Sequence, residues 1–179
     1  AIPDADPVIV VYCDGIQKFS YDKFNEYVRD RDLDGCLFTH TGFHPHTLNP
    51  ATKMAFVKLA GDYVTEVKEK ESYTDDPYSE HASSGAYYFR SGTLVKQFFS
   101  KALEVGLTYK GEYYVTLVYN LLVAAGLRVG IFDTIVAILG TPEEVKNYEA
   151  WNQIINSGHV KNESEAVMCY RYWKAFQVL

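Results

Sequence analysis

The chain has 179 residues, a length typical of one domain that builds its own hydrophobic core. It carries 17 Lys and Arg against 23 Asp and Glu, and this net charge of −6 argues against nucleic acid or an anionic membrane surface as a partner. No apolar run approaches the ~20 residues that span a bilayer, and no secretory leader opens the chain. Three scattered cysteines indicate neither a disulfide framework nor a zinc knuckle. We therefore expect a soluble, cytoplasmic protein without a membrane partner.

The first part of the chain predicts a strand, a helix and a second strand. Val8 to Cys13 is a short, β-branched apolar run, which is typical of a strand buried on both faces in a parallel sheet. Ser20 can cap a following helix that has one apolar face. Cys36 to Thr39 is the second strand. This order predicts a βαβ unit.

The rest of the chain continues the alternation, with one interruption. Two strands flank the turn Gly61-Asp62 and predict a hairpin. The later elements are a strand at 85–89, a helix at 94–105 ended by Gly106, a helix at 114–125 ended by Gly126, strand at 128–139, a helix from the Thr141–Glu144 capping box to 155, and a final helix at 162–179. Because a hairpin interrupts the alternation, we expect an α/β fold with a mixed sheet.

Asp14 directly follows the predicted buried strand. In open α/β sheets ligands bind beyond the carboxyl ends of strands, so this carboxylate is well placed for a hydrated Mg²⁺. Asp-Gly is also a common turn pair, and a strand-ending turn is the alternative.

Glu69 and Lys70 end the second hairpin strand. A carboxylate accepts hydrogen bonds from a sugar diol, and an ammonium neutralises a phosphate. Adjacent strand residues point to opposite faces, so both can meet one ligand only if the strand bends or ends there. Otherwise they are two more charges on a solvent-exposed face.

Two further groups are weaker candidates. Lys110, Gly111 and Glu112 precede a predicted helix, and a cation beside a helix amino end can form an anion site, although a loop with solvated charges is equally consistent. Three histidines lie close together in a segment rich in turn residues. They suggest a metal site only weakly, and we favour a surface turn: His40, His44 and His46.

Taken in order, these pieces resemble the sugar-phosphate nucleotidyltransferase (NDP-sugar pyrophosphorylase) family, in particular its capsule and surface-polysaccharide branch. The resemblance covers Pro7 to about Trp151. It rests on the strand ending in Asp14, the hairpin ending in Glu69-Lys70, and the segments "EHASSGAYYF", "KGEYYVTLVYN" and "LGTPEEV". It implies a three-layer α/β/α fold with a mixed, mostly parallel sheet. It also implies the joining of a nucleoside triphosphate to a sugar 1-phosphate, with Mg²⁺ and release of pyrophosphate.

The resemblance also implies a role for each matching residue. Asp14 corresponds to the aspartate that holds the metal, Glu69 to the acid that binds sugar hydroxyls, and Lys70 to the lysine that contacts the sugar phosphate. Asp14 and Lys70 would be the catalytic pair. The remaining substrate-binding positions are Gly85, before the strand that lines the sugar pocket, Lys110, near phosphate, and Glu112 of the "GE" pair.

Two features depart from the family pattern. Relatives begin with a Gly-rich phosphate loop inside a βαβ unit of ~30 residues or more, which is absent here. Ile138 stands where many relatives have a second metal-binding aspartate. Without the βαβ unit, the Val8–Cys13 strand would expose an apolar edge. We therefore expect either a fragment of a longer enzyme or a chain that recruits the missing part, for instance by dimerising, and we expect poor nucleotide binding by the chain alone.

Residues 1–157 would form the sugar-phosphate-binding part, and residues 158–179 a C-terminal helix. The main alternative is a non-catalytic sugar-phosphate-binding or regulatory domain of the same fold. A glycosyltransferase of similar fold would normally show an Asp-x-Asp metal pair, and "CDGIQ" does not provide one.

Overall fold

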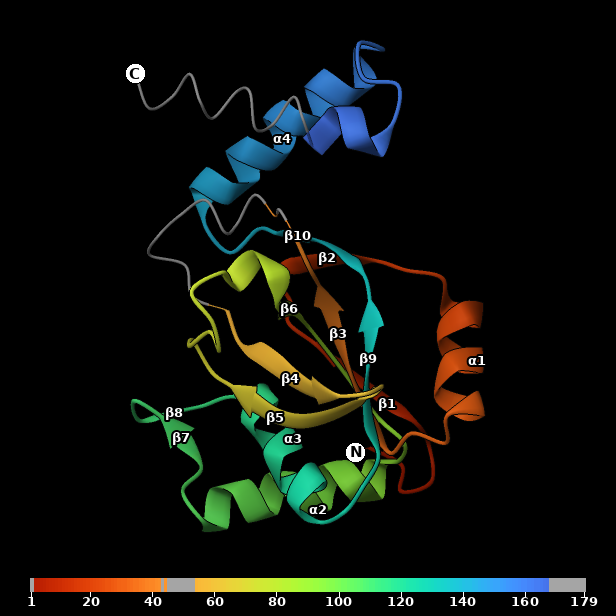
Figure 1. Cartoon of the computed structure of the whole chain (residues 1–179), viewed down its shortest axis with the longest axis vertical. Coiled ribbons are helices and arrows are strands. Elements are labelled where there is room, and N and C mark those ends of the chain that lie inside the picture. Colours follow the sequence, from red (N-terminus) through yellow and green to blue (C-terminus); the bar gives the residue numbers. More distant parts are fainter. Residues whose placement is uncertain (1, 43, 45–53, 168–179) are drawn as a thin grey trace.

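The computed structural model describes residues 2–42, 44 and 54–167 (Figure 1). The helices are α1 (Tyr21–Asp30), α2 (Gly92–Glu104), α3 (Val115–Ala124) and α4 (Pro142–Asn156). The strands are β1 (Val8–Val11), β2 (Gly15–Lys18), β3 (Gly35–His40), β4 (Phe56–Ala60), β5 (Tyr63–Lys68), β6 (His81–Phe89), β7 (Thr108–Tyr109), β8 (Glu112–Tyr113), β9 (Val129–Asp133) and β10 (Ile135–Ile138).

The central sheet has the order β5-β4-β6-β3-β9, and β1 pairs with β6. The sheet is mixed, as expected, but the prediction that it is mostly parallel is wrong. Among the described strands only β3 and β9 pair in parallel, and the other pairings of this sheet are antiparallel. The reason is the place of β6. It runs antiparallel between β1 and β3, so the strand–helix–strand order is present although its two strands are not neighbours.

Helices cover both faces of this sheet, which confirms the three layers (Figure 1). Alternate residues of β3 serve the two faces: Leu37 packs in the core beneath α2 and α3, whereas Phe38 packs in the core beneath α1. Tyr119 of α3 is fully buried, and its hydroxyl donates to the carbonyl oxygen of Tyr88 at 2.8 Å. The period-2 alternation of the strand thus ties the two helical layers to one sheet.

The β6 strand changes partner near its middle. Its first residues pair with β4, and its last four pair with β1. Gly85 lies at the change, with a φ of +84° that favours glycine. The register with β3 also shifts here, between Leu37 and Thr39. Such an irregularity redirects the side chains around it, and it brings the end of β1 beside the middle of β6.

The position of β1 differs from the sequence prediction. We predicted a strand buried on both faces, but three of its residues are half-buried and Val11 is exposed. Within the described part of the chain, β6 is its one strand partner. No second strand pairs with the other edge of β1 among the described residues.

The helix ends follow the predicted signals. The Ser20 side chain caps α1, and Thr141 with Glu144 forms the predicted capping box of α4. Gly106 and Gly126 have φ values of +62° and +76° after α2 and α3. Residues 163–167 are helical, and the rest of the predicted final helix, including Cys169, lies outside the described residues.

A small second sheet was not predicted. The strand β2 pairs antiparallel with β10, and Gln17 of β2 donates from its amide nitrogen to the carbonyl oxygen of Ser84 at 2.5 Å. This pairing links the chain just after Asp14 to the chain just before α4. It therefore sets the surroundings of the Asp14 carboxylate.

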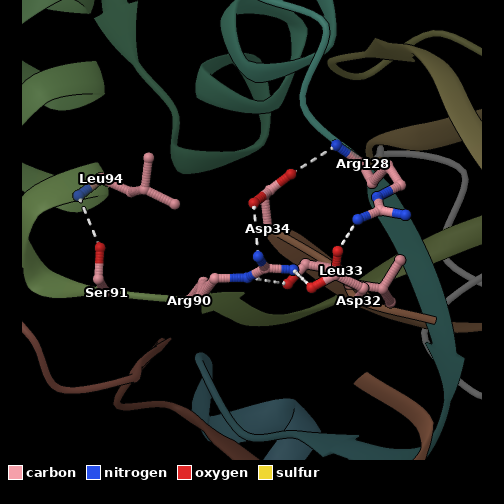
Figure 2. A network of polar contacts seen from close by, with 7 residues as sticks. All are labelled: Asp32, Leu33, Asp34, Arg90, Ser91, Leu94 and Arg128. Carbon is pink, nitrogen blue, oxygen red and sulfur yellow. Dashed lines mark hydrogen bonds and ion pairs between the residues drawn. The ribbon is translucent and has the colours of Figure 1, made fainter. Parts of the chain in front are cut away.

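A charged network joins the end of β6 to the starts of β3 and β9 (Figure 2). Arg90 donates from Nε to the carbonyl oxygen of Leu33 at 2.9 Å and forms ion pairs with Asp32 and Asp34 at 2.7 and 3.4 Å. The backbone N–H of Arg128 donates to Asp34 at 2.8 Å, and its guanidinium pairs with Asp32. The network fixes three strands to one another.

No helix of the described residues has the length and apolar character needed to cross a membrane.

Candidate functional site

Glu69 and Lys70 meet the condition set by the sequence, because β5 ends at Lys68. Lys70 has a φ of +60°, a left-handed conformation that is uncommon outside glycine and that turns the chain out of the strand. Glu69 is only 7% exposed, and its carboxylate accepts a hydrogen bond from the Thr116 hydroxyl. The two charged side chains can therefore serve one ligand.

Tyr114 connects the two charged ends of the site. Its hydroxyl accepts a hydrogen bond from the Lys70 ammonium and donates one to the Glu112 carboxylate. The ammonium lies 4.5 Å from the centre of the Tyr114 ring and 3.9 Å from the Glu112 carboxylate. Three contacts thus hold the ammonium at the beginning of α3.

The middle of α3 is fixed to the edge strand β5. Asn120 accepts a hydrogen bond from the backbone N–H of Val67 and donates one to its carbonyl oxygen, both at 2.8 Å. The side chain thus completes the hydrogen bonding of an edge-strand residue. It also sets the distance between Glu69 and the helix residues Tyr114 and Thr116.

The expected anion site at Lys110 is different in the structure. Lys110 and Gly111 do not lead directly into a helix but form the two-residue turn between β7 and β8. Both have positive φ values, +50° and +84°, the pattern of a type I′ hairpin turn. The Lys110 ammonium lies 5.5 Å from the Tyr109 ring centre, and that ring is 6.5 Å from the Tyr114 ring. Lys110 is therefore connected to Lys70 through two aromatic rings.

Asp14 is exposed and lies beside the start of α4. Its backbone carbonyl accepts from the Leu139 N–H at 2.7 Å. A Cβ at Gly140 would lie 2.8 Å from the Asp14 carboxylate and 3.5 Å from that of Glu144, so both carboxylates lie close to the backbone at this point. The carboxylate is therefore close to the segment that contains Ile138, where the sequence resemblance led us to look for a second metal-binding aspartate.

Asp14 and the residues around it fit a magnesium ion only if substrate phosphates and water supply most of its ligands. The described residues contain no group of three or more His, Cys, Asp or Glu side chains able to hold a metal. Glu144 is engaged in the α4 capping box. Mg²⁺ commonly keeps several waters and takes one or two carboxylates together with substrate phosphates. Asp14 fits that arrangement, whereas a site made of protein side chains alone does not fit.

The histidine segment is not the surface turn that we favoured. His40 lies in β3, and both His40 and His44 are buried. Their rings are 4.5 Å apart, and the His44 Nε2 atom lies 2.6 Å from the carbonyl oxygen of Val136. His46 lies outside the described residues. The two described histidines therefore belong to the interior.

Burial raises the pKa of the Glu69 carboxyl above its ordinary value, although the Thr116 hydroxyl and the Lys70 charge oppose the shift. A raised carboxyl pKa means that the ionised form destabilises the fold, so the stability present at low pH is lost as pH rises through the folded-state pKa. We expect Glu69→Gln to be more stable than the parent at pH 7, with the difference shrinking as pH falls through the raised folded-state pKa toward 4.5.

Urea unfolding of the parent and of Glu69→Gln at pH 7 and pH 4 measures this difference. Glu66→Gln, at an exposed carboxylate on the strand that precedes Glu69, is the control for a general change in net charge. A Glu69→Gln variant that is less stable than the parent at pH 7 would contradict the stated effect of burial.

Sequence reasoning missed three residues of this region: Tyr12, Tyr114 and Thr116. Tyr114 and Thr116 belong to the quoted segment "KGEYYVTLVYN", but they were interpreted only as part of a helix. The available signal was a tyrosine and a threonine at the start of an otherwise apolar helix, where the first side chains can reach a neighbouring charge. Gly85, which we predicted to start a strand, lies in the middle of β6, and its missing side chain leaves room for the Tyr12 ring.

Comparison with known proteins finds similar structures but no similar curated sequences. No protein-family model matches the sequence. No curated protein sequence matches it either. Many solved structures are similar, and three of them are compared with the chain in turn. A nucleoside-diphosphate-sugar pyrophosphorylase from Vibrio cholerae RC9 aligns over 79% of this chain with 21% identity and a TM-score of 0.60.

Two further similar structures are also named as nucleotidyltransferases. A protein from Bacillus anthracis assigned as a glucose-1-phosphate thymidylyltransferase, in complex with a sucrose, aligns over 90% of the chain with 14% identity and a TM-score of 0.58. The inositol-1-phosphate CTP transferase from T. maritima aligns over 82% with 14% identity and a TM-score of 0.53.

The chain has a nucleotidyltransferase-like fold. It spans only 55%, 58% and 55% of the three similar chains, so it corresponds to little more than half of each. At these identities the similarity establishes the fold and leaves the reaction to be argued from the site.

Proposed function

We propose that this chain binds a sugar 1-phosphate for transfer to a nucleotide. The observation that carries the proposal is the convergence of Glu69, Thr116, Tyr114 and Lys70 where β5 ends and α3 begins. On a nucleotidyltransferase-like fold, this arrangement offers a buried acceptor for sugar hydroxyls and a fixed ammonium for a phosphate.

In the proposed reaction, a phosphate oxygen of the sugar 1-phosphate attacks the α-phosphorus of a nucleoside triphosphate. One P–O bond forms, the bond to the β-phosphate oxygen breaks, and pyrophosphate leaves with that electron pair. The product is an NDP-sugar. Such a transfer depends mostly on positioning and on charge neutralisation. Glu69 orients the sugar through its hydroxyls, Lys70 neutralises and directs the attacking phosphate, and Lys110 and Glu112 complete the edge of the site.

Asp14 is the residue that we assign to a magnesium ion. When bound, Mg²⁺ would neutralise charge on the transferring phosphoryl group. The chain itself holds the Asp14 carboxylate beside Gly140, with the Asp14 backbone fixed by Leu139. Because Ile138 offers no second carboxylate, Asp14 would share the ion with substrate phosphates and water.

We place the reaction in the cytoplasm and in cell-surface polysaccharide synthesis, following the sequence resemblance. We also propose that residues 1–157 form the sugar-phosphate-binding part, with residues 158–179 as a separate C-terminal helix. Since the described residues contain no Gly-rich phosphate loop, nucleotide binding would need residues of a further segment or of a second copy of the chain.

A non-catalytic sugar-phosphate-binding domain is the second candidate. Ile138 near Asp14 favours it, because an apolar side chain stands where a second metal ligand would be. Both candidates predict sugar-phosphate binding, and they differ in what Asp14 does.

Asp14→Asn in the full-length protein separates the two candidates. Pyrophosphate release is measured across nucleoside triphosphates and sugar 1-phosphates. If the protein is an enzyme, we expect turnover to fall about 100-fold or more while the fold is kept. This is the size of loss that enzymes commonly show when one group that stabilises charge in the transition state is removed. Asp62→Asn, at the distant tip of the β4–β5 hairpin, is the control and should leave turnover unchanged. Absence of turnover in the parent would count against an enzyme, and turnover that survives Asp14→Asn would count against the metal-binding role assigned to Asp14.

A further inference from the structure

Tyr12 is the residue between the two halves of the proposed site. It follows β1 and precedes Asp14 by two positions, and its backbone N–H donates to the carbonyl oxygen of Gly85 at 3.0 Å. Its position is therefore set by the point at which β6 changes partner.

The Tyr12 ring is held on two sides. It packs edge-on against the Tyr87 ring, with centroids 5.6 Å apart and an interplanar angle of 67°. Tyr87 is 1% exposed, its hydroxyl lies 3.0 Å from that of Ser83, and it makes a hydrogen bond with Tyr12. A Cβ at Gly85 would lie 3.1 Å from the Tyr12 Cδ2 atom. The hydroxyl and part of the ring are thus engaged by the protein.

The rest of the Tyr12 side chain is accessible, since the residue is 41% exposed. Asp14 follows it by two residues. On the other side, the Ser83 residue that contacts Tyr87 donates from its backbone N–H to the carbonyl oxygen of Ala55 at 2.9 Å. Ala55 directly precedes β4, and Glu69 directly follows the paired end of β5. A fixed aromatic surface therefore lies between the groups assigned to the sugar and to the metal.

A ring sugar matches this arrangement. Its hydroxyls point outward from the rim, where Glu69 and Thr116 can bind them, and its faces carry C–H groups. Aromatic rings have a negative face that attracts the weakly positive hydrogens of C–H groups. An acyclic polyol phosphate has the same hydroxyls and phosphate but no rigid C–H face.

We propose that Tyr12 is the stacking platform for the substrate ring and makes the site selective for cyclic over acyclic polyol phosphates. This inference rests on the proposed function, because it assumes that Glu69 and Lys70 bind the same molecule. Tyr12 contributes selectivity through its ring, whereas its hydroxyl only fixes the ring against Tyr87.

Calorimetric titration with glucose 1-phosphate, sorbitol 6-phosphate and inorganic phosphate tests the platform. The parent should prefer glucose 1-phosphate to sorbitol 6-phosphate. Tyr12→Leu should reduce that preference about 3- to 10-fold, the range expected for one aromatic contact. Tyr12→Phe should keep the preference, and neither variant should change the affinity for inorganic phosphate.

A second readout needs no variant. Sugar ring protons that stack on Tyr12 should shift upfield in the proton NMR spectrum of glucose 1-phosphate when the parent protein is added. An unchanged preference in Tyr12→Leu, or binding without this upfield shift, would overturn the platform and leave the proposed function standing. Absence of saturable binding of either sugar phosphate by the parent would overturn both.

Discussion

Replacing Lys70 with alanine is expected to weaken binding of glucose 1-phosphate about 10- to 100-fold, because a hydrogen bond to a charged group contributes about 1.5–3 kcal/mol. The Lys70 ammonium contacts Tyr114 and Glu112, so it is already oriented before a phosphate arrives. This preorganisation reduces the ordering required on binding. Isothermal titration calorimetry at fixed ionic strength measures the effect.

Lys68→Ala is the matched control for this prediction. Lys68 lies two residues earlier on β5, carries the same charge, and packs 4.5 Å from the Tyr73 ring rather than at Tyr114. We expect its loss to change the affinity less than about 2-fold, because only the distant charge is lost and salt screens it. Equal weakening by both variants would mean that general positive charge, and not the position of Lys70, binds the phosphate.

The Arg90 network should account for the largest effect on folding. We expect Arg90→Ala to lower the free energy of unfolding by about 1.5–3 kcal/mol, since it removes hydrogen bonds to a charged group. It leaves the Leu33 carbonyl without this donor and removes a partner of Asp34, whose side chain is only 17% exposed (Figure 2). Urea unfolding monitored by circular dichroism measures the change.

Two further variants show whether the fold is stabilised by the planar geometry of the Arg90 guanidinium or by its charge alone. Arg90→Lys keeps the charge but cannot donate to three partners from one planar group, so most of the stability should still be lost. Arg29→Ala removes an exposed helix arginine paired with the adjacent Asp30, and should change stability by less than about 0.5 kcal/mol. An Arg90→Ala variant as stable as Arg29→Ala would show that the network does not hold the three strands together.

Local signals in the sequence predicted the helices better than the sheet. The Ser20 cap, the Thr141–Glu144 box and the turn at Gly61-Asp62 each depend on a few adjacent residues, and all three are confirmed. Strand neighbours depend on contacts far apart in sequence. The apolar pattern of Val8 to Val11 therefore indicated a strand but could not reveal that an antiparallel β6 lies next to it.

The β2 strand was missed for a similar reason. Its residues alternate between half-buried and exposed, and Ile16 is exposed, so no apolar run marks it. Its partner β10 lies more than a hundred residues later in the chain. Only the folded chain shows that this pairing places Asp14 beside Gly140.

For the candidate site, the types of residue indicated the chemistry, but the sequence did not show how their side chains are oriented. The pattern indicated a carboxylate and an ammonium at the end of a strand, but not that Lys70 would adopt a positive φ. Nor could spacing show that Tyr114 and Thr116, more than forty residues away, would fix their positions. The expected helix-end site at Lys110 became a hairpin turn because Gly111 favours a type I′ turn at that point.

Mapping the binding of glucose 1-phosphate onto the backbone amides by NMR is the most direct test of the sugar-phosphate site. Titration of the isotope-labelled chain should shift the amide signals of residues 12–14, 69–70 and 110–116, and leave those of the Arg90 network unchanged. Shifts confined to Arg90 and Arg128, or no saturable shifts at all, would contradict the account.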